Sequence, residues 1–322
     1  MMAGRNHQKS PFLLTIVSML TAPKKDETVT GRNPENLDHG VQSMRNTLRR
    51  RPTRTSMAVI AFVGALGMVM PVSAGPLEDG KALLEKKDFA NAARTFADGF
   101  DKGDGEAGFH LARMVELGVG FTPDPVKARA LYIAAAERGS AAAMNRLGLM
   151  HLRGENVRQD FAAASELICK AADLGNMEAQ FNCAGLALDG LGRAKDPAIA
   201  FGYYQKASQS GHTGGRNMEA ALLRTGTGTE QDAAKAVKLF EQGASLGNPV
   251  SLYGFAEMLE KGEGAAADPV RAHLYYNLAN ERGHPGARAA LERLTANMTS
   301  AEIEDAQARA RNWKPAQAAE AN

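Results

Sequence analysis

Along most of this chain, large apolar residues recur at the three- and four-residue spacing of amphipathic helices, and the predicted helices come in pairs. The first helix of a pair, for example over residues 141–152, carries a large residue beside a small one, as at Leu147 and Gly148. Such a pair lets a neighbouring helix approach closely. The second helix has a doubled apolar position, filled by Leu131, Tyr132, Leu167, Ile168, Tyr203, Tyr204, Leu239, Phe240, Tyr275 and Tyr276. The pattern predicts antiparallel helix hairpins.

The predicted hairpins repeat every 36 residues, and glycine marks the repeat. One series follows the second helices: Gly103, Gly139, Gly175, Gly211, Gly247 and Gly283. Another follows the first helices: Gly118, Gly154, Gly190, Gly226 and Gly262. Two residues later stand Gly120, Gly192, Gly228 and Gly264, with Asn156 as the one substitute. Glycine, and after it asparagine, tolerates the left-handed backbone that ends a helix. Fifteen of the 33 glycines therefore serve this repeat.

The helix starts follow the same period. An aspartate series, Asp124, Asp160, Asp196, Asp232 and Asp268, precedes the second helices, and three of its members are followed by proline. An aspartate side chain caps free N–H groups, and proline suits the first helical position. The residues placed to cap the next first helix are Ser140, Asn176, His212, Asn248 and His284.

One hairpin cannot cover its own apolar stripe, so the units must stack. The sequence predicts an all-α fold, a right-handed α-solenoid of 36-residue antiparallel helix hairpins, with five full repeats over residues 104–283. Asp88 and Phe96 keep the repeat phase in a shorter N-terminal cap. A helix over 287–294 and another, begun by the capping box from Thr299 to Glu302, form a C-terminal cap closed by Trp313. The solenoid should span residues 75–313, and residues 314–322 should be a disordered tail.

The first 74 residues have a different character. Several arginines from Arg45 onward precede a 14-residue apolar run, and small residues lead to Ala74. This predicts a Sec signal peptide over residues 44–74, cleaved after Ala74, and a periplasmic or secreted protein with no integral membrane span after cleavage. Because Met44 stands directly before Arg45, we interpret residues 1–43 as lying upstream of the true start. A genuine leader and an uncleaved anchor are the alternatives. The mature chain would carry 28 Lys and Arg against 32 Asp and Glu.

At these positions the sequence resembles the Sel-one-like repeats, a subclass of the tetratricopeptide-type helical repeats. The second full unit matches the pattern at Leu147-Gly148, Gly154, Val157, Asp160, Lys170-Ala171-Ala172 and Gly175. Glu219 departs from it, because Leu111, Leu147 and Phe255 stand at the equivalent position in three other units, and its helix is expected to pack poorly. The resemblance implies an adaptor protein, and exported bacterial members act in envelope signalling, cell-wall regulation and host contact.

Little in the chain points to chemistry. A net charge of +2 spread over this length argues against nucleic acid as a partner, which would need a concentrated basic face. The G-x-S-x-G match over residues 243–247 lies at the end of a predicted helix, where a nucleophile elbow cannot form. The histidines lack metal-ligand spacing, so neither a metal nor a cofactor is expected. Cys169 and Cys183 lie at similar heights on neighbouring antiparallel helices and could form a disulfide, although the positions equivalent to Cys169 carry polar residues in most units.

In stacked hairpins the first helices line the concave side, and their positions not used for packing face a groove. The candidate partner-binding residues are Phe109, Arg113, Asn145, Leu149, Leu152, Phe181, Leu188, Asn217, Arg224, Tyr253 and Glu257. We expect an apolar middle, two asparagines placed to hydrogen-bond a peptide backbone, exposed aromatic rings, and acids towards the C-terminal end.

These observations predict an exported, non-enzymatic scaffold that binds a protein or peptide, with a cell-wall component as a further candidate partner. The alternative is an enzyme or enzyme subunit acting on peptidoglycan or β-lactams. Convergent titratable side chains with shifted pKa values would favour that alternative.

Overall fold

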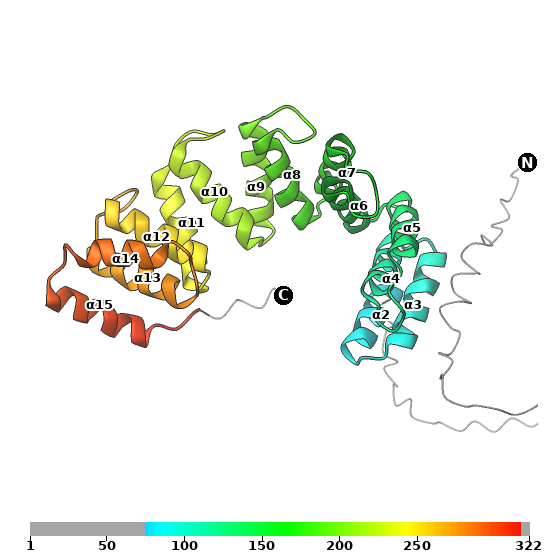
Figure 1. The fold of residues 1–322 in the computed structure, drawn as a ribbon, viewed down its shortest axis with the longest axis horizontal. Helices are drawn as coiled ribbons and strands as arrows, with labels where there is room; N and C mark the ends of the chain where they lie inside the picture. Colours follow the sequence, from blue (N-terminus) through cyan, green and yellow to red (C-terminus); the bar gives the residue numbers. More distant parts are fainter. Residues whose placement is uncertain (1–74, 317–322) are drawn as a thin grey trace, which may run out of the picture. The chain divides into compact units, whose positions relative to one another are not determined.

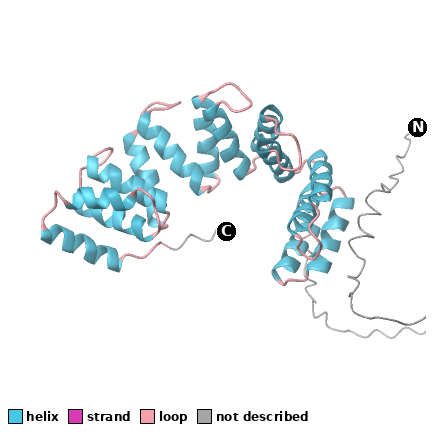
Figure 2. Cartoon of the chain, in the orientation of Figure 1, coloured by secondary structure: helices cyan, strands magenta, loops and turns pink. Residues whose placement is uncertain are grey.

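The computed structural model describes residues 75–316. The expected upstream segment (1–43), the expected signal peptide (44–74) and residues 317–322 of the expected tail lie outside the described residues. Between residues 75 and 316 the regular elements are α-helices joined by loops (Figures 1 and 2). In chain order they are α2 (Pro76–Glu85), α3 (Phe89–Asp101), α4 (Gly105–Leu117), α5 (Pro125–Glu137), α6 (Ala141–Arg153), α7 (Phe161–Asp173), α8 (Met177–Asp189), α9 (Pro197–Gln209), α10 (Thr213–Thr225), α11 (Ala233–Ser245), α12 (Pro249–Lys261), α13 (Pro269–Glu281), α14 (Ala287–Thr295) and α15 (Ser300–Asn312).

Five hairpins, from α4–α5 to α12–α13, form the repeat region. Their helices are each 13 residues long, and equivalent helices begin 36 residues apart. We call the first helix of each hairpin helix A and the second helix B. From α2 to α13, each helix packs against the next one in the chain. The predicted all-α solenoid is confirmed.

The predicted capping residues explain why the helices begin and end where they do. The carboxylate of each aspartate in the series accepts hydrogen bonds from backbone N–H groups in the first turn of helix B. The glycines that end helix A have φ between 68° and 74°, in the left-handed region. Asn156, the substitute in the following glycine series, has φ 56°. Asparagine therefore adopts the left-handed backbone of this turn, as predicted.

Close packing between the two helices of a hairpin depends on the small residues of helix A. A Cβ atom added at Gly148 would lie 2.4 Å from Cγ1 of Ile168 on α7. Ile168 itself is fully buried. Any larger residue at position 148 would force the two helices apart, which agrees with the predicted pairing of large and small residues.

The two ends of the solenoid depart from the repeat. Asp88 caps α3, as predicted, and the preceding turn uses Lys87 at φ 59° in place of glycine. The capping box at the start of α15 is present, and Trp313 packs against the buried cluster of the last repeats. His284 does not cap α14, which begins three residues later, although its Nδ1 accepts from the Gly286 N–H at 3.3 Å. The prediction that His284 caps the next helix was therefore wrong, because the N-cap of α14 is Gly286.

None of the helices between residues 75 and 316 combines the length and apolar character that crossing a membrane requires. After α15, the backbone N–H of Ala316 donates to the carbonyl oxygen of Ser245 at 2.7 Å. This hydrogen bond connects residue 316, in the expected tail, to the end of α11.

Candidate interaction surface

The eleven predicted binding residues all lie on A helices, from α4 to α12. Arg113 is exposed, Asn145 and Asn217 are buried, and the other eight are half-buried. The apolar members Leu149, Leu152 and Leu188 come from α6 and α8, in the second and third repeats. We call the surface formed by the eight half-buried residues and Arg113 the A-helix face.

The two asparagines do not belong to this face. Asn145 is 9% exposed, and its Oδ1 accepts from Nδ2 of Asn182 at 3.1 Å. Asn217 is 8% exposed; its Oδ1 accepts from the Ser251 hydroxyl at 2.5 Å and its Nδ2 donates to Oδ1 of Asn248 at 3.1 Å. These bonds join one A helix to the next, or to its N-cap. The prediction that both asparagines face a bound peptide was wrong, because neighbouring repeats already satisfy them.

The three aromatic residues of the face are half-buried, because each ring packs against another aromatic ring. Their rings lie 5.4–5.8 Å from tyrosines on the following B helices, in the pairs Phe109–Tyr132, Phe181–Tyr204 and Tyr253–Tyr276. Both the aromatic residues and their tyrosine partners are spaced by 72 residues, so the packing alternates between successive repeats. Comparing every second unit of the sequence would have revealed this alternation.

At the N-terminal end of the face, charges are held in a network. Glu116 accepts from the Tyr132 hydroxyl at 2.6 Å and from Nε of Arg146 at 3.0 Å, and Arg146 also pairs with Glu155 at 2.8 Å. Burial alone would raise the pKa of Glu116, but the hydrogen bonds from Arg146 and Tyr132 outweigh it and lower the pKa. The carboxylate therefore stays ionised, which does not suit a general acid at neutral pH.

A second network lies at the C-terminal end, and it includes two predicted residues. Arg224 donates to Glu257 at 2.7 Å and to Glu263 at 2.5 Å, and Lys261 donates to Glu257 at 2.8 Å. Burial favours the neutral form of Glu257, but its bonds to Arg224 and Lys261 lower its pKa overall. Glu257 is therefore a paired acid, and Arg224 is neutralised by two carboxylates.

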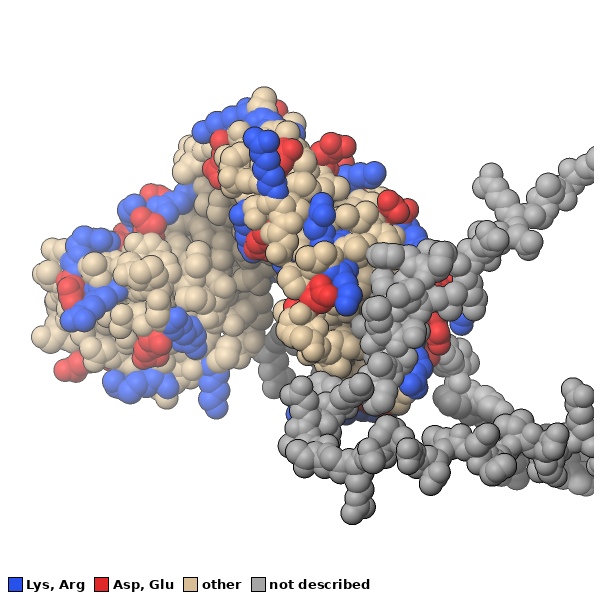
Figure 3. Space-filling view, turned by 45° about the vertical axis from the view of Figure 1, so that its right-hand side comes forward, with Lys and Arg blue, Asp and Glu red and all other residues tan. Residues whose placement is uncertain are grey.

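Between the two networks the face is apolar. Leu149 and Leu152 pack against the buried cluster around Ile168, and Leu188 packs against the cluster around Tyr204. Gly185 on α8 is half-buried, and a Cβ added there would lie 3.6 Å from the Tyr204 hydroxyl, in ordinary contact. In the view of Figure 3, basic and acidic side chains lie interspersed over the described surface. The face therefore offers an apolar centre between ion-paired ends.

Ser245, the serine of the G-x-S-x-G match, is the last residue of α11, and its hydroxyl donates to the carbonyl of Gln242 at 2.8 Å. This helical setting differs from the strand–turn–helix that a nucleophile elbow needs. Among residues 75–316, no group of three or more His, Cys, Asp or Glu side chains is placed to hold a metal ion.

Cys169 on α7 and Cys183 on α8 form a disulfide, with Cα atoms 5.0 Å apart. Cys183 is fully buried, whereas Cys169 is half-buried. Nη1 of Arg193 lies 3.1 Å and 3.6 Å from the two sulfur atoms. The bond links helix B of the second repeat to helix A of the third, and Cys183 belongs to the hydrophobic cluster against which Cys169, Leu149 and Leu152 pack.

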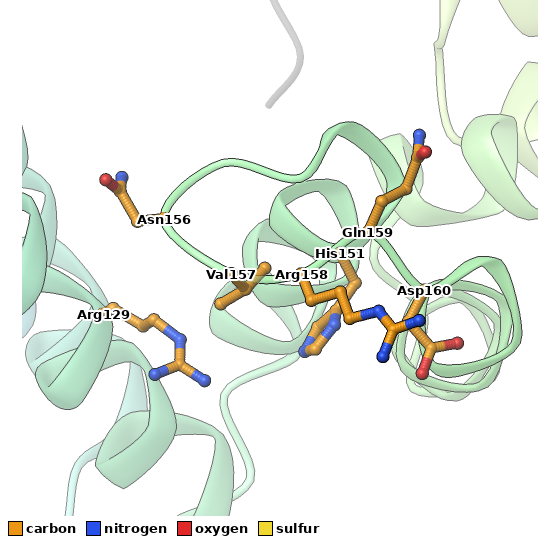
Figure 4. A pocket seen from close by; sticks show the side chains of 7 residues that line it. All are labelled: Arg129, His151, Asn156, Val157, Arg158, Gln159 and Asp160. Atoms are coloured by element: carbon orange, nitrogen blue, oxygen red, sulfur yellow. The ribbon is translucent and has the colours of Figure 1, made fainter.

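Two adjoining cavities that no sequence pattern predicts lie between α5, α6 and α7. One has a volume of about 540 Å³ and is lined mainly by polar residues, and the other, of about 340 Å³, is mainly apolar. Both are lined by Arg129 and His151, and neither is lined by any of the eleven predicted residues. Figure 4 shows Arg129 extending from α5 towards His151 and the loop that precedes α7.

Comparison with known proteins agrees with this architecture. The family model described as Sel1 repeat matches residues 105–140, 141–176, 178–212, 220–248 and 249–284, which together make up more than half of the chain. The chain belongs to the Sel1 repeat family. Sel1 repeat proteins generally mediate protein–protein interactions, and their fold is typically a non-catalytic scaffold. A search of curated proteins finds no significant match.

Two solved structures resemble this Sel1 repeat protein. A Sel1 repeat protein from Oxalobacter formigenes has 22% sequence identity and a TM-score of 0.63, over 77% of this chain and 100% of that one. The protein c5321, a protective antigen of uropathogenic Escherichia coli with an SLR fold, has 20% identity and a TM-score of 0.51, over 74% of this chain and 60% of that one. At these identities the likeness concerns the fold alone.

Proposed function

We propose that this Sel1 repeat protein is an exported, periplasmic scaffold that binds a protein or peptide partner on its A-helix face. The observation that carries the proposal is the half-buried apolar centre at Leu149, Leu152 and Leu188, between two ion-paired ends. Apolar surface rimmed by polar groups is typical of protein interaction sites. The paired acids and the helical setting of Ser245 give no support to a hydrolase.

The repeat itself supplies a substitution that tests this face. Leu152 and Leu188 occupy a position that carries Glu116, Arg224 and Glu260 in the other repeats, so the fold accepts a charge there. A Leu152→Glu/Leu188→Glu variant should keep its melting temperature within a few degrees, yet lose apolar contact with a partner. Val126→Glu/Leu174→Glu is the matched control, because these residues are 73% and 56% exposed and lie outside the A-helix face.

Peptides would be selected from a displayed random library on the immobilised full-length protein, and their affinities measured for each variant. We expect binding to weaken about tenfold or more in the double leucine variant, since a fully buried leucine side chain contributes about 1.5–3 kcal/mol. The control should bind as the wild type does. Equal affinity for both variants, or a selection that enriches no peptide, would contradict the proposal.

Export is proposed from the arginine-rich and apolar segments before Ala74, and the Cys169–Cys183 disulfide supports it because such bonds persist in oxidising compartments. N-terminal sequencing of the protein recovered from a periplasmic fraction should begin at Gly75. Recovery of the chain from the cytosol with its N-terminus intact would refute export.

A further inference from the structure

The cavities beside Arg129 lie where two residues differ in character from those at the equivalent positions of the other repeats. The positions equivalent to His151 on the other A helices are all buried and apolar: Val115, Ala187, Leu223 and Leu259. On the B helices, the positions equivalent to Arg129 are Ser165, Phe201, Val237 and His273. Arg129 on α5 and His151 on α6 thus stand where most other repeats carry buried residues, and both line the two cavities.

The loop beside them departs from the repeat as well. In later repeats the second turn glycine lies directly against the start of the preceding B helix, and an added Cβ at Gly192, Gly228 or Gly264 would stand 1.7–2.1 Å from a carbonyl oxygen there. Asn156 carries a Cβ at the equivalent position, so the same close approach to α5 is sterically forbidden. The polar cavity, lined by Asn156 and Arg129, occupies this interval.

The basic groups of the cavity lack partners of their own. Nε of Arg129 and Nδ1 of His151 are buried without a hydrogen bond, and neither Arg129 nor Arg158 forms an ion pair with any residue between 75 and 316. By contrast, the half-buried arginines Arg146 and Arg224 each pair with two carboxylates. The acid that lines the polar cavity, Asp160, already accepts from the Ala163 N–H at 3.0 Å to cap α7. Buried polar atoms without partners are costly, and the guanidinium of Arg129 is a cation with a free donor, so this arrangement suits an external anion.

The apolar cavity continues from the same two residues. Its walls include Ile133, Ala136, Met144, Leu147 and Leu167, with Glu137 and Lys170 of opposite charge also lining it. Because Arg129 and His151 line both cavities, an anionic group bound in one lies close to an apolar group bound in the other. The last residue of a protein chain has this chemistry, since its carboxylate and its side chain share one Cα atom.

We propose that these cavities bind the C-terminal residue of a partner protein. Its carboxylate lies at Arg129 and Arg158 in the polar cavity, and its apolar side chain lies in the apolar cavity, which Met144 lines. Asn156 and Gln159 also line the polar cavity; Gln159 Nε2 donates to the carbonyl oxygen of Leu152 at 2.9 Å, which leaves its Oε1 to accept from a peptide N–H of the partner. An alkanoate has no N–H group to donate to this oxygen, which is why the structure favours a peptide. The site is separate from the A-helix face and does not depend on the function proposed for that face.

The test uses pools of N-acetylated tetrapeptides on the immobilised full-length protein. The first three positions are randomised, the last is leucine, valine or phenylalanine, and each pool is made as a free acid and as an amide. Free acids should be retained about tenfold or more better than amides, because a charge-assisted hydrogen bond is about twice as strong as a neutral one. Equal retention of both forms, or no retention of the free acids, would overturn the proposal. Displacement by dodecanoate at the same concentration would overturn it too, by showing that a simple alkanoate suffices.

Three variants separate binding from folding. Arg129→Ser, which introduces the residue of the next repeat, and Arg158→Gln, on an exposed loop residue, should each reduce retention of free acids about tenfold. His151→Leu should also reduce it while leaving the melting temperature unchanged or raised, since leucine is the residue at two equivalent core positions. Arg311→Gln on α15 is the charge-matched control and should bind normally. Normal retention by the Arg129 and Arg158 variants would refute the site, and normal retention by Leu152→Glu/Leu188→Glu would show that it is independent of the A-helix face.

Discussion

The imidazole of His212 stacks on the ring of Phe181, with centroids 4.5 Å apart. His212 is the N-cap of α10, where its Nδ1 accepts from the Gly215 N–H at 2.9 Å, while Phe181 belongs to the A-helix face on α8. One side chain therefore begins a helix and also fixes an aromatic ring of the preceding repeat. His284 stacks on Tyr253 at 4.2 Å in the same way, two repeats later.

Replacing His212 should show both contributions. His212→Ala removes the cap, worth about 1 kcal/mol, and a ring contact worth about 0.5–1.5 kcal/mol. His212→Asn keeps a cap of the kind present at Asn176 and Asn248 and should recover part of the loss. Urea unfolding, monitored by circular dichroism, gives the free energy of unfolding of both variants and of the wild type. If the asparagine variant is no more stable than the alanine variant, the cap does not contribute.

The disulfide should contribute to stability through the unfolded chain. Cys169 and Cys183 are 14 residues apart in sequence, and closing a loop of this length stabilises a protein by about 3 kcal/mol. Adding a reductant should therefore lower the urea midpoint of the wild type. A Cys169→Ser/Cys183→Ala variant should resemble the reduced protein and show no response to reductant. A wild-type midpoint that ignores reductant, with free thiols confirmed by titration, would contradict this.

Acidification should destabilise the protein before its carboxylates titrate. Burial lowers the pKa of His273 and His284 below 6.5, and burial with the positive charge of Lys81 lowers that of His110. The unfolded chain then takes up protons at higher pH than the folded one. Stability is full above pH 6.5 and falls as the pH drops from there towards the folded-state pKa values.

The buried His273 offers a control for this effect. It is fully enclosed, its Nδ1 has no hydrogen-bond partner, and the equivalent residue one repeat earlier is Val237. His273→Val should therefore flatten the decline of the melting temperature between pH 7 and about 5. A decline as steep in this variant as in the wild type would assign the effect to other groups.

Glu219 tests how the solenoid tolerates a charge in its core. It is 3% exposed, at the position of Leu147 and Phe255, and it pairs with Lys235 at 3.0 Å. Lys235→Ala should cost about 1–3 kcal/mol, because the buried carboxylate then keeps only the hydrogen bond from Gln205 Nε2 at 3.3 Å. Glu219→Leu removes the charge together with the need for a partner and should be neutral or stabilising. Thermal unfolding compares the stability of the two variants. A larger loss of stability in Glu219→Leu than in Lys235→Ala would argue that the ion pair itself stabilises the fold.

Much of the fold could be predicted from the sequence because its determinants are local. The aspartate caps and the left-handed glycines act within one helical turn, so their period alone located the helices of the repeat region to within a few residues. His284 is the exception. Its imidazole stacks on Tyr253 as that of His212 stacks on Phe181, yet α14 begins only at Ala287, with Gly286 at its N-cap.

The candidate surface was less predictable. Whether a polar residue of helix A meets solvent or another repeat depends on a partner 31 to 37 residues away, as for Asn217 with Asn248 or Asn145 with Asn182. The charges of Arg224 and Glu257 could be assigned to one surface, but their pairing could not. The cavity at Arg129 could not be predicted, because it arises where Arg129, His151 and Asn156, on two helices and a loop, each replace the residue usual in the repeat.

The sequence by itself determined the helix boundaries, the 36-residue period and the membership of a stacked helical-repeat fold, since capping, turn conformation and apolar spacing are properties of neighbouring residues. Only the tertiary structure decided which side chains remain available to a partner. The physical reason is that a buried polar group must find a hydrogen-bond partner, and in this solenoid that partner is most often supplied by the adjacent repeat.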